Sequence, residues 1–356
     1  MNSTPPLPAT IAYEDPDYWS WCPSIVQGED GKWHLFASRW PKSIPFHPGW
    51  LLCSEIIRAE SDRLEGPYEF AEVVIQGRGA DWWDGRSVHN PSLRRDGNRW
   101  VLFYMGSTHP FEDPEPHQSL PGSDPRVVVA RWHERVGVAV AEKLTGPWMR
   151  PDRPTLETRP GCFDSWITSN PTACPSEDGS WFMVYKARAT VGSLSKPTHG
   201  EMTLGIARAA RPEGPWVREE SPIMQAEGLG GIEDPFVWRS QRGNELLFKD
   251  MKDSFTGCLH ALVRAWSPDG RSWKLDETPL FSDRRVLWPD GRVEQLGSLE
   301  RPSLVFQNGK ATHLVAAAAD GPGWFQGISK TFIVAAKLPD PYEPPAKAAK
   351  TARKSE

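Results

Sequence analysis

Short runs of alternating apolar and polar residues fill most of the chain, and each run ends in a turn rich in Gly, Pro and Asp. Residues 136–140 and 204–207 are clear examples. Such alternation, with turns about every 8 to 12 residues, is typical of β-strands. Helical periodicity is nearly absent. The pattern therefore predicts an all-β protein.

One hairpin pattern recurs five times. It consists of a residue, a proline and Ser, Thr or Phe, followed about ten residues later by a glycine turn and a second apolar run. The prolines stand at 23, 91, 171, 235 and 302, so successive copies are 68, 80, 64 and 67 residues apart. Each interval leaves room for four strands. The repeat predicts a five-bladed β-propeller, a closed ring that hides its sheet edges, with blades starting near 21, 89, 169, 233 and 300.

The second half of the repeat is a Gly-Pro-aromatic turn at residues 66–68, 146–148 and 214–216. Together the two patterns predict a single propeller domain over residues 20–338. Residues 1–19 are expected to form a cap on the N-terminal side or to complete the last blade. Residues 339–356 are Pro-rich and then basic, which predicts a disordered tail.

Composition excludes several classes of partner. The net charge is −5 and the basic residues are scattered, so no positive track for a nucleic acid exists. No apolar run is long enough to span a bilayer, and the N-terminus lacks the pattern of a secretory signal, so we expect no membrane association. The oligomeric state is not indicated.

Five cysteines without ligand or disulfide spacing are most simply explained as reduced thiols of a cytoplasmic protein. Nine histidines show no close ligand spacing, so we predict no catalytic metal and no cofactor. A structural cation in a central channel is compatible with the sequence.

In a propeller the first strand of each blade lines the central channel. The residues before the repeated prolines therefore converge, and we call them the pre-proline ring. Proline is tolerated there because the first strand position need not donate to the ladder. The ring consists of Cys22, Asn90, Asn170, Asp234 and Arg301, and the residues before these are Trp21, His89, Ser169, Glu233 and Glu300.

The repeated hairpins and Gly-Pro-aromatic turns resemble those of the five-bladed propeller glycoside hydrolases, particularly glycoside hydrolase family 43 and its relative family 117. The resemblance covers residues 20–338. It implies a glycosidase with an Asp general base at the head of blade one, an auxiliary Asp in blade three and a Glu general acid in blade four. This sequence departs from that pattern at blade one, where Cys22 stands in place of the base. Since a thiol does not replace a carboxylate base, that role moves elsewhere, or the activity is changed or lost.

The resemblance places Glu233 and Asp234 at the position of the general acid. Glycoside cleavage needs a protonated carboxyl group on the leaving oxygen and a second group that activates water or attacks. Adjacent strand residues point to opposite faces, so we expect only one of the two to face the sugar. The alternative interpretation is structural, with one of them capping a turn or pairing with Arg301.

Glu300 and Arg301 in blade five complement that pair. An arginine beside carboxylates keeps one ionised, while a drier neighbour stays protonated, and this separation is what acid/base work requires. A purely structural ion pair is the alternative.

Two further aspartates occupy matching places. Asp84 and Asp164 each precede a ring asparagine by six residues, which predicts that both lie at the channel mouth. Local turn formation is the alternative. Asp17, with Asp15 beside it, is the candidate for the carboxylate missing from blade one.

Candidate substrate-binding residues include the ring members Asn90, Asn170 and Arg301. His89 is a candidate proton donor or hydroxyl ligand, resembling the histidine acid of family 117, and His260 is an equal candidate in blade four. The alternative interpretation of each histidine is an ordinary neutral side chain held by hydrogen bonds. Trp21, Trp82, Trp83 and Trp40 are candidates for a sugar-stacking wall or for the core. The cations that end second strands suggest an anionic substrate or neutralise the acidic pocket; they are Arg39, Lys186, Arg188 and Lys249.

The leading interpretation is an exo-acting glycosidase that cleaves a terminal sugar of an oligosaccharide or glycoside, with Asp234 or Glu233 as the acid. A phosphorylase, in which phosphate replaces water, is the second. A non-catalytic carbohydrate-binding propeller is the third, suggested by Cys22 at the position of the base.

Overall fold

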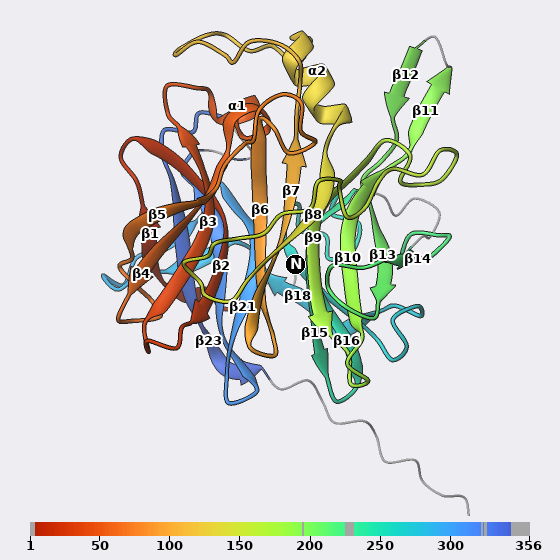
Figure 1. Ribbon diagram of the computed structural model, residues 1–356. Coiled ribbons are helices and arrows are strands. Elements are labelled where there is room, and N and C mark those ends of the chain that lie inside the picture. The colour runs from red at the N-terminus through yellow and green to blue at the C-terminus, as the bar shows by residue number, and fades with distance from the viewer. Residues whose placement is uncertain (1–3, 194–195, 225–230, 322, 324–325, 343–356) are drawn as a thin grey trace, which may run out of the picture.

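The computed structural model describes residues 4–193, 196–224, 231–321, 323 and 326–342. In these residues, five sheets stand side by side around a central axis, as Figure 1 shows, and one separate hairpin projects from them. The predicted all-β, five-bladed propeller is confirmed. The first strand of each sheet begins near its predicted position, next to the axis.

Blades one to three follow one plan, in which consecutive strands pair antiparallel from the axis outward. Blade one consists of β2 (Tyr18–Gln27), β3 (Trp33–Pro41), β4 (Glu55–Ser61) and β5 (Glu69–Ile75). Blade two consists of β6 (Ser87–Asp96), β7 (Arg99–Ser107) and β8 (Arg135–Ala141). Blade three consists of β9 (Ile167–Pro175), β10 (Trp181–Arg188), β13 (Thr203–Ala209) and β14 (Val217–Arg218), and the hairpin β11 (Thr190–Ser193) and β12 (Lys196–His199) projects from it.

Blade four consists of β15 (Ile232–Ser240), β16 (Gly243–Asp250), β17 (Leu262–Ser267) and β18 (Lys274–Ser282).

Blade five is closed by the N-terminal segment. Blade five consists of β21 (Ser298–Gln307), β22 (Lys310–Ala319), β23 (Thr331–Tyr342) and β1 (Leu7–Glu14), extended by β19 (Arg285–Leu287) and β20 (Val293–Gln295). Antiparallel pairing of β1 with β23 joins the two ends of the chain. Most of the predicted tail, residues 343–356, lies outside the described residues.

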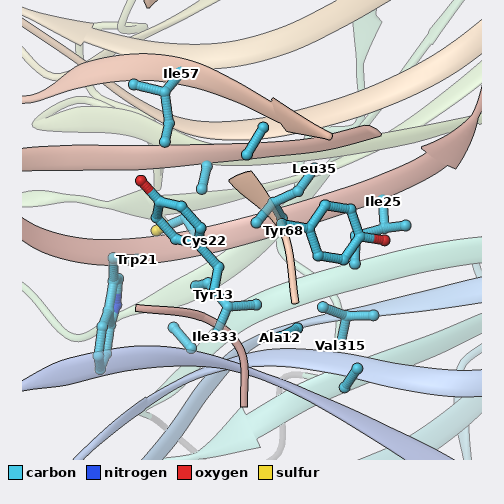
Figure 2. Close-up of a cluster of buried hydrophobic side chains, with 14 of the residues drawn as sticks. Ala12, Tyr13, Trp21, Cys22, Ile25, Leu35, Ile57, Tyr68, Val315 and Ile333 are labelled. Carbon is cyan, nitrogen blue, oxygen red and sulfur yellow. The ribbon is translucent and has the colours of Figure 1, made fainter. Parts of the chain in front are cut away.

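The contact between the first and last blades holds the ring closed. Figure 2 shows side chains of β2, β3 and β4 packed against side chains of β1, β22 and β23. Tyr13, Leu35, Ile57 and Ile333 are at most 5% exposed in this cluster. Burying a side chain of this size stabilises a fold by roughly 1.5–3 kcal/mol, so the cluster is a strong closure.

Two short helices, which the strand pattern did not indicate, interrupt the first two blades. They are α1 (Phe46–Cys53) and α2 (Pro125–Trp132), and both lie at the end of the propeller that is uppermost in Figure 1. Asp124 caps α2 by accepting a hydrogen bond from the Arg126 backbone N–H at 2.9 Å. An Asp-Pro pair is a recognised helix start, so this helix did carry a sequence signal. Neither helix is long enough to cross a membrane.

The matching aspartates 84 and 164 each tie the second strand of their blade to more distant segments of the chain. Each carboxylate is fully buried and binds two arginines and a tyrosine hydroxyl. Asp84 accepts from Arg78, Arg150 and Tyr104 at 2.7, 3.2 and 2.8 Å. Asp164 accepts from Arg159, Arg218 and Tyr185 at 3.0, 3.0 and 2.9 Å. The match seen in the sequence is therefore structural, which corrects the expectation that both lie at the channel mouth.

Replacing Asp84 or Asp164 with Asn should lower the free energy of unfolding by about 3 kcal/mol, because two partly buried guanidinium groups lose their counter-charge. Urea denaturation measures this. Asp81→Asn, an exposed change in the same loop as Asp84, is the control and should cost about 0.5 kcal/mol or less. Equal losses in all three variants would contradict the structural role.

Candidate active site

A β-bulge at the same place in all five blades brings the candidate residues into one layer. In each first strand the register slips by one residue, so that the ring residue and its proline together face one residue of the second strand. Bulges re-aim side chains in this way. Proline suits the site because it has no N–H to leave unpaired. All five ring residues have positive φ, between 48° and 60°: Cys22, Asn90, Asn170, Asp234 and Arg301.

This backbone shape explains part of the sequence. Left-handed backbone costs most residues about 1–2 kcal/mol, and Asn and Asp tolerate it best. Three of the five ring residues are Asn or Asp. The bulge also overturns the expectation that only one of Glu233 and Asp234 faces the cavity, since both line it.

The ring residues join side chain to side chain in a closed circuit. Cys22 Sγ donates to Asn90 Oδ1 at 2.9 Å, Asn90 Nδ2 donates to Asn170 Oδ1 at 2.6 Å, and Asn170 Nδ2 donates to Asp234 Oδ1 at 3.1 Å. Arg301 completes the circuit by donating to Asp234 Oδ1 at 2.6 Å and to Cys22 Sγ at 3.3 Å. The circuit separates a main cavity from a small one of about 30 Å³ on the other side.

Cys22 serves this circuit as a neutral thiol. Burial raises the pKa of Cys22 to about 12, although Arg301 acts in the opposite direction. A thiol donates one hydrogen bond and accepts another, and the circuit uses both. The cysteine at the predicted position of the base is therefore a link in the cavity floor.

The main cavity has a volume of about 140 Å³ and an aromatic wall. Its aromatic residues are Trp21, Trp40, Phe46, Trp50 and Trp166, the third and fourth of them from α1. The Trp21 and Phe46 rings meet edge to face with centroids 5.0 Å apart. Flat apolar walls of this kind suit the faces of a sugar ring. The helices that interrupt the blades thus help to enclose the cavity.

A lysine–glutamate pair occurs twice between neighbouring blades. Lys186 of β10 donates to Glu233 Oε1 of β15 at 2.7 Å. Lys249 of β16 makes the equivalent bond to Glu300 of β21. In both pairs the second strand of one blade meets the first strand of the next, so the two glutamates are structural equivalents.

The two equivalent glutamates nevertheless differ in proton affinity. Burial alone would raise the pKa of Glu233, but Lys186, Lys249 and Arg301 outweigh it and lower the pKa to about 2. Burial raises the pKa of Glu300 above its usual range, and the charge of Asp234 adds to it, while Lys249 opposes both.

The strand register explains the difference. Glu233 pairs across its hairpin with Lys249, so a lysine lies on each side of it. Glu300 pairs across its hairpin with Ala317 and keeps one lysine. Two equivalent carboxyl groups with opposite pKa shifts form a combination suited to acid/base chemistry.

Asp234 and His89 line the cavity but carry other contacts. Both Asp234 oxygens are engaged, Oδ1 by Asn170 and Arg301 and Oδ2 by the Arg301 backbone N–H at 3.2 Å. His89 contacts Ser54 Oγ at 2.8 Å. Burial, with the nearby charges of Arg301 and Lys186, holds the pKa of His89 well below its usual range. A neutral imidazole favours hydrogen bonding over the role of proton donor.

Other predicted residues lie outside the cavity lining. Asp17 is exposed, and Trp82 stacks on Arg78 at 4.1 Å, 38% exposed. Lys249 is fully buried behind Glu300. His260 does not line the cavity, and burial lowers its pKa to about 4. In the part of the chain described, no cluster of three or more His, Cys, Asp or Glu is arranged to hold a metal ion.

Several cavity residues were missed by sequence reasoning. Arg131 and Glu134 stand at the end of α2 and just after it, on an insert that no repeat marks. Trp166 directly precedes β9, two residues after Asp164, where the matching position of blade two is Arg86. Lys186 could have been linked to its role by aligning the second strands, where Ser38, Met105 and Ala317 occupy the equivalent register.

Comparison with known proteins gives matches in structure but not in sequence. No protein-family model matches the chain, and no curated protein matches it by sequence. Zg3597, a family 117 glycoside hydrolase of the marine bacterium Zobellia galactanivorans, is 15% identical with a TM-score of 0.64, covering 93% of this chain and 90% of its own. A thermostable family-43 glycoside hydrolase is 12% identical with a TM-score of 0.59, covering 95% and 99%.

A family 93 α-L-arabinofuranosidase of Fusarium graminearum, solved with arabinobiose, is 13% identical with a TM-score of 0.53 and covers 91% and 79%. The resemblance to five-bladed propeller glycoside hydrolases is thus confirmed. At these identities the likeness establishes the fold, and the chemistry has to be argued from the cavity.

Replacing Asp234 with Asn should lower the free energy of unfolding by about 3–5 kcal/mol, because it leaves the buried Arg301 guanidinium without its counter-charge and opens the circuit. Urea denaturation measures the loss. Lys32→Gln, which removes an exposed ion pair with Glu60, should cost at most about 1 kcal/mol. An Asp234→Asn protein of unchanged stability would contradict the structural role and restore Asp234 as a candidate acid.

Proposed function

We propose that this protein is a glycoside hydrolase in which Glu300 is the general acid and Glu233 the ionised partner. The observation that carries the proposal is the opposite pKa shift of these two glutamates in one aromatic-walled cavity. The leading sequence hypothesis is kept, while the acid moves from blade four to blade five.

The proposed reaction uses each group in its favoured state. Glu300 donates its proton to the glycosidic oxygen as the bond from that oxygen to the anomeric carbon breaks. A water molecule forms the new bond to that carbon, and Glu233 accepts the proton that the water loses. Lys186 and Lys249 keep Glu233 ionised until that step.

The shape of the cavity supports cleavage of a terminal sugar. A volume of about 140 Å³ is small beside the roughly 300–1,000 Å³ of typical ligand pockets. The pre-proline ring closes its floor, which leaves no continuous channel for a polymer. An exo-acting enzyme that receives one sugar from a glycoside fits this geometry.

Cations in the cavity lining favour an anionic ligand. Arg131 and Arg188 line the cavity in addition to Lys186. Such a set suits an anionic sugar, or inorganic phosphate as the group that replaces water in a phosphorylase. Assays of glycoside cleavage with and without phosphate separate these two cases.

The proposal predicts turnover of at least one aryl glycoside in a panel of arabinofuranosides, xylosides, galactosides and galacturonides. Glu300→Gln should reduce kcat by about 10²–10⁴-fold, because it removes the proton donor. Exposed Glu69→Gln is the matched control and should leave kcat unchanged. Release that requires phosphate would indicate the phosphorylase, and binding without turnover of any glycoside would indicate a carbohydrate-binding propeller.

The pH profile of kcat/KM should report the two glutamates separately. Glu300 must be protonated, so activity should fall as pH rises through its raised pKa. Glu233 must be ionised, so activity should fall at acid pH only near its pKa of about 2.

Two lysine variants test that assignment. Lys186→Met should move the acid limb to higher pH and leave the alkaline limb in place, because Lys186 bonds to Glu233, whereas Glu300 is bonded by Lys249. Lys249→Met should move both limbs to higher pH, because Lys249 lowers the pKa of both glutamates. Identical profiles for the two variants would count against the assignment.

A further inference from the structure

Glu134 is a buried carboxylate that the proposed reaction does not use. It lies between α2 and β8, its side chain is 1% exposed, and it lines the cavity. Neither of its oxygens has a hydrogen-bond partner among the residues that the structure describes. The nearest cation is Arg131, whose Nη1 is 3.8 Å from Oε1, beyond hydrogen-bond distance.

Glu134 is an exception among the buried carboxylates that the structure describes. The others all accept hydrogen bonds; they are Asp84, Asp164, Asp234, Glu245, Asp250, Asp283 and Glu300. A buried polar group without a partner is costly, and such exceptions concentrate at functional sites. The exception here faces the one cavity that also holds the two equivalent glutamates.

Trp166 is a second cavity residue with an unused polar atom. It is 9% exposed, and its indole Nε1, which only donates, has no hydrogen-bond partner in the described part of the chain. The two residues belong to adjoining segments, since the backbone N–H of Thr168 donates to the carbonyl oxygen of Glu134 at 3.3 Å. Trp132 packs edge to face on Trp166 with ring centroids 4.7 Å apart, which fixes the indole.

The unused atoms define the chemistry of a ligand that could bond to both residues. An ionised carboxylate only accepts hydrogen bonds, and an indole N–H only donates. An ammonium group would donate to the carboxylate but could not accept from the indole N–H. A carboxylate or phosphate would accept from the indole N–H but could not donate to the carboxylate. Hydroxyl groups both donate and accept, and two adjacent hydroxyls match the two oxygens of one carboxylate.

We propose that Glu134 and Trp166 form a hydroxyl-binding subsite that recognises adjacent hydroxyl groups of the bound sugar. This rests on the proposed function in taking a sugar as the ligand, and it adds a specificity determinant from an insert outside the blade repeat. A sugar lacking one of those hydroxyls would leave the buried carboxylate unsatisfied and should be rejected.

The test compares the binding of a sugar and of its deoxy analogues to proteins with and without Glu134. Binding is measured by calorimetry, and every protein carries Glu300→Gln so that the sugar is not cleaved. The probes are methyl glycosides of arabinofuranose, xylose, galactose and galacturonate, with their monodeoxy analogues. For the sugar that binds best, one deoxy analogue should bind about 10-fold or more weakly. Adding Glu134→Ala should weaken binding of the parent sugar similarly and abolish the discrimination between the two.

Two controls separate recognition from a structural role. Glu157→Ala removes an exposed carboxylate that is paired with Arg135 and should leave both affinities unchanged. Glu134→Gln should raise the melting temperature of the free protein, because it removes a buried charge that accepts no hydrogen bond and has one cation 3.8 Å away, at a site shaped for a ligand.

The outcomes are distinguishable from those of the proposed function. Full discrimination against the deoxy analogue in Glu134→Ala would overturn the subsite even if glycosides are hydrolysed. Binding that depends on Glu134, without turnover by the unmodified protein, would support the subsite and overturn the hydrolase. Binding of none of the four sugars would overturn both.

Discussion

The ion pair of Asp234 with Arg301 is the interaction on which the centre of the molecule depends. It closes a circuit of five side chains, one from each blade, that forms the floor of the cavity. Each of those residues is held in left-handed backbone by the same bulge. In four of the five blades the preceding residue also lines the main cavity: Trp21, His89, Glu233 and Glu300. The circuit therefore also fixes the positions of the residues that directly precede the ring, among them Glu233 and Glu300.

The residues that directly precede the ring show how a repeated fold gives two equivalent glutamates different proton affinities. Glu233 and Glu300 occupy equivalent places and each bonds to a lysine of the preceding blade. One substitution between equivalent positions, Lys249 in β16 against Ala317 in β22, gives Glu233 a second lysine and leaves Glu300 with one. Burial then dominates at Glu300, and charge dominates at Glu233. Divergence within a repeat is thus enough to shift the pKa values of two equivalent carboxyl groups in opposite directions.

The fold could be predicted because strands and turns leave local signals, and five copies of the same signal reinforce one another. The site was predictable only where it follows the repeat, as for Glu233 and Glu300. Asp84 and Asp164 misled because a structural ion cluster also repeats. Glu134 was missed because it lies on an insert, where burial and an unused hydrogen-bonding capacity are properties of the assembled cavity. The roles of the two glutamates depend on cross-strand register, which a β-bulge shifts by one residue.

The central claim, that the pKa values of two equivalent glutamates are shifted in opposite directions, is tested most directly by a carbon NMR titration of protein labelled at the glutamate side-chain carboxyl carbon. The resonances are assigned by their loss in Glu300→Gln and in Glu233→Gln. The account predicts that the Glu300 signal titrates above the usual range of glutamate, and that the Glu233 signal stays that of a carboxylate until far below it. Titration of both groups in the usual range, or in the reverse order, would contradict the account.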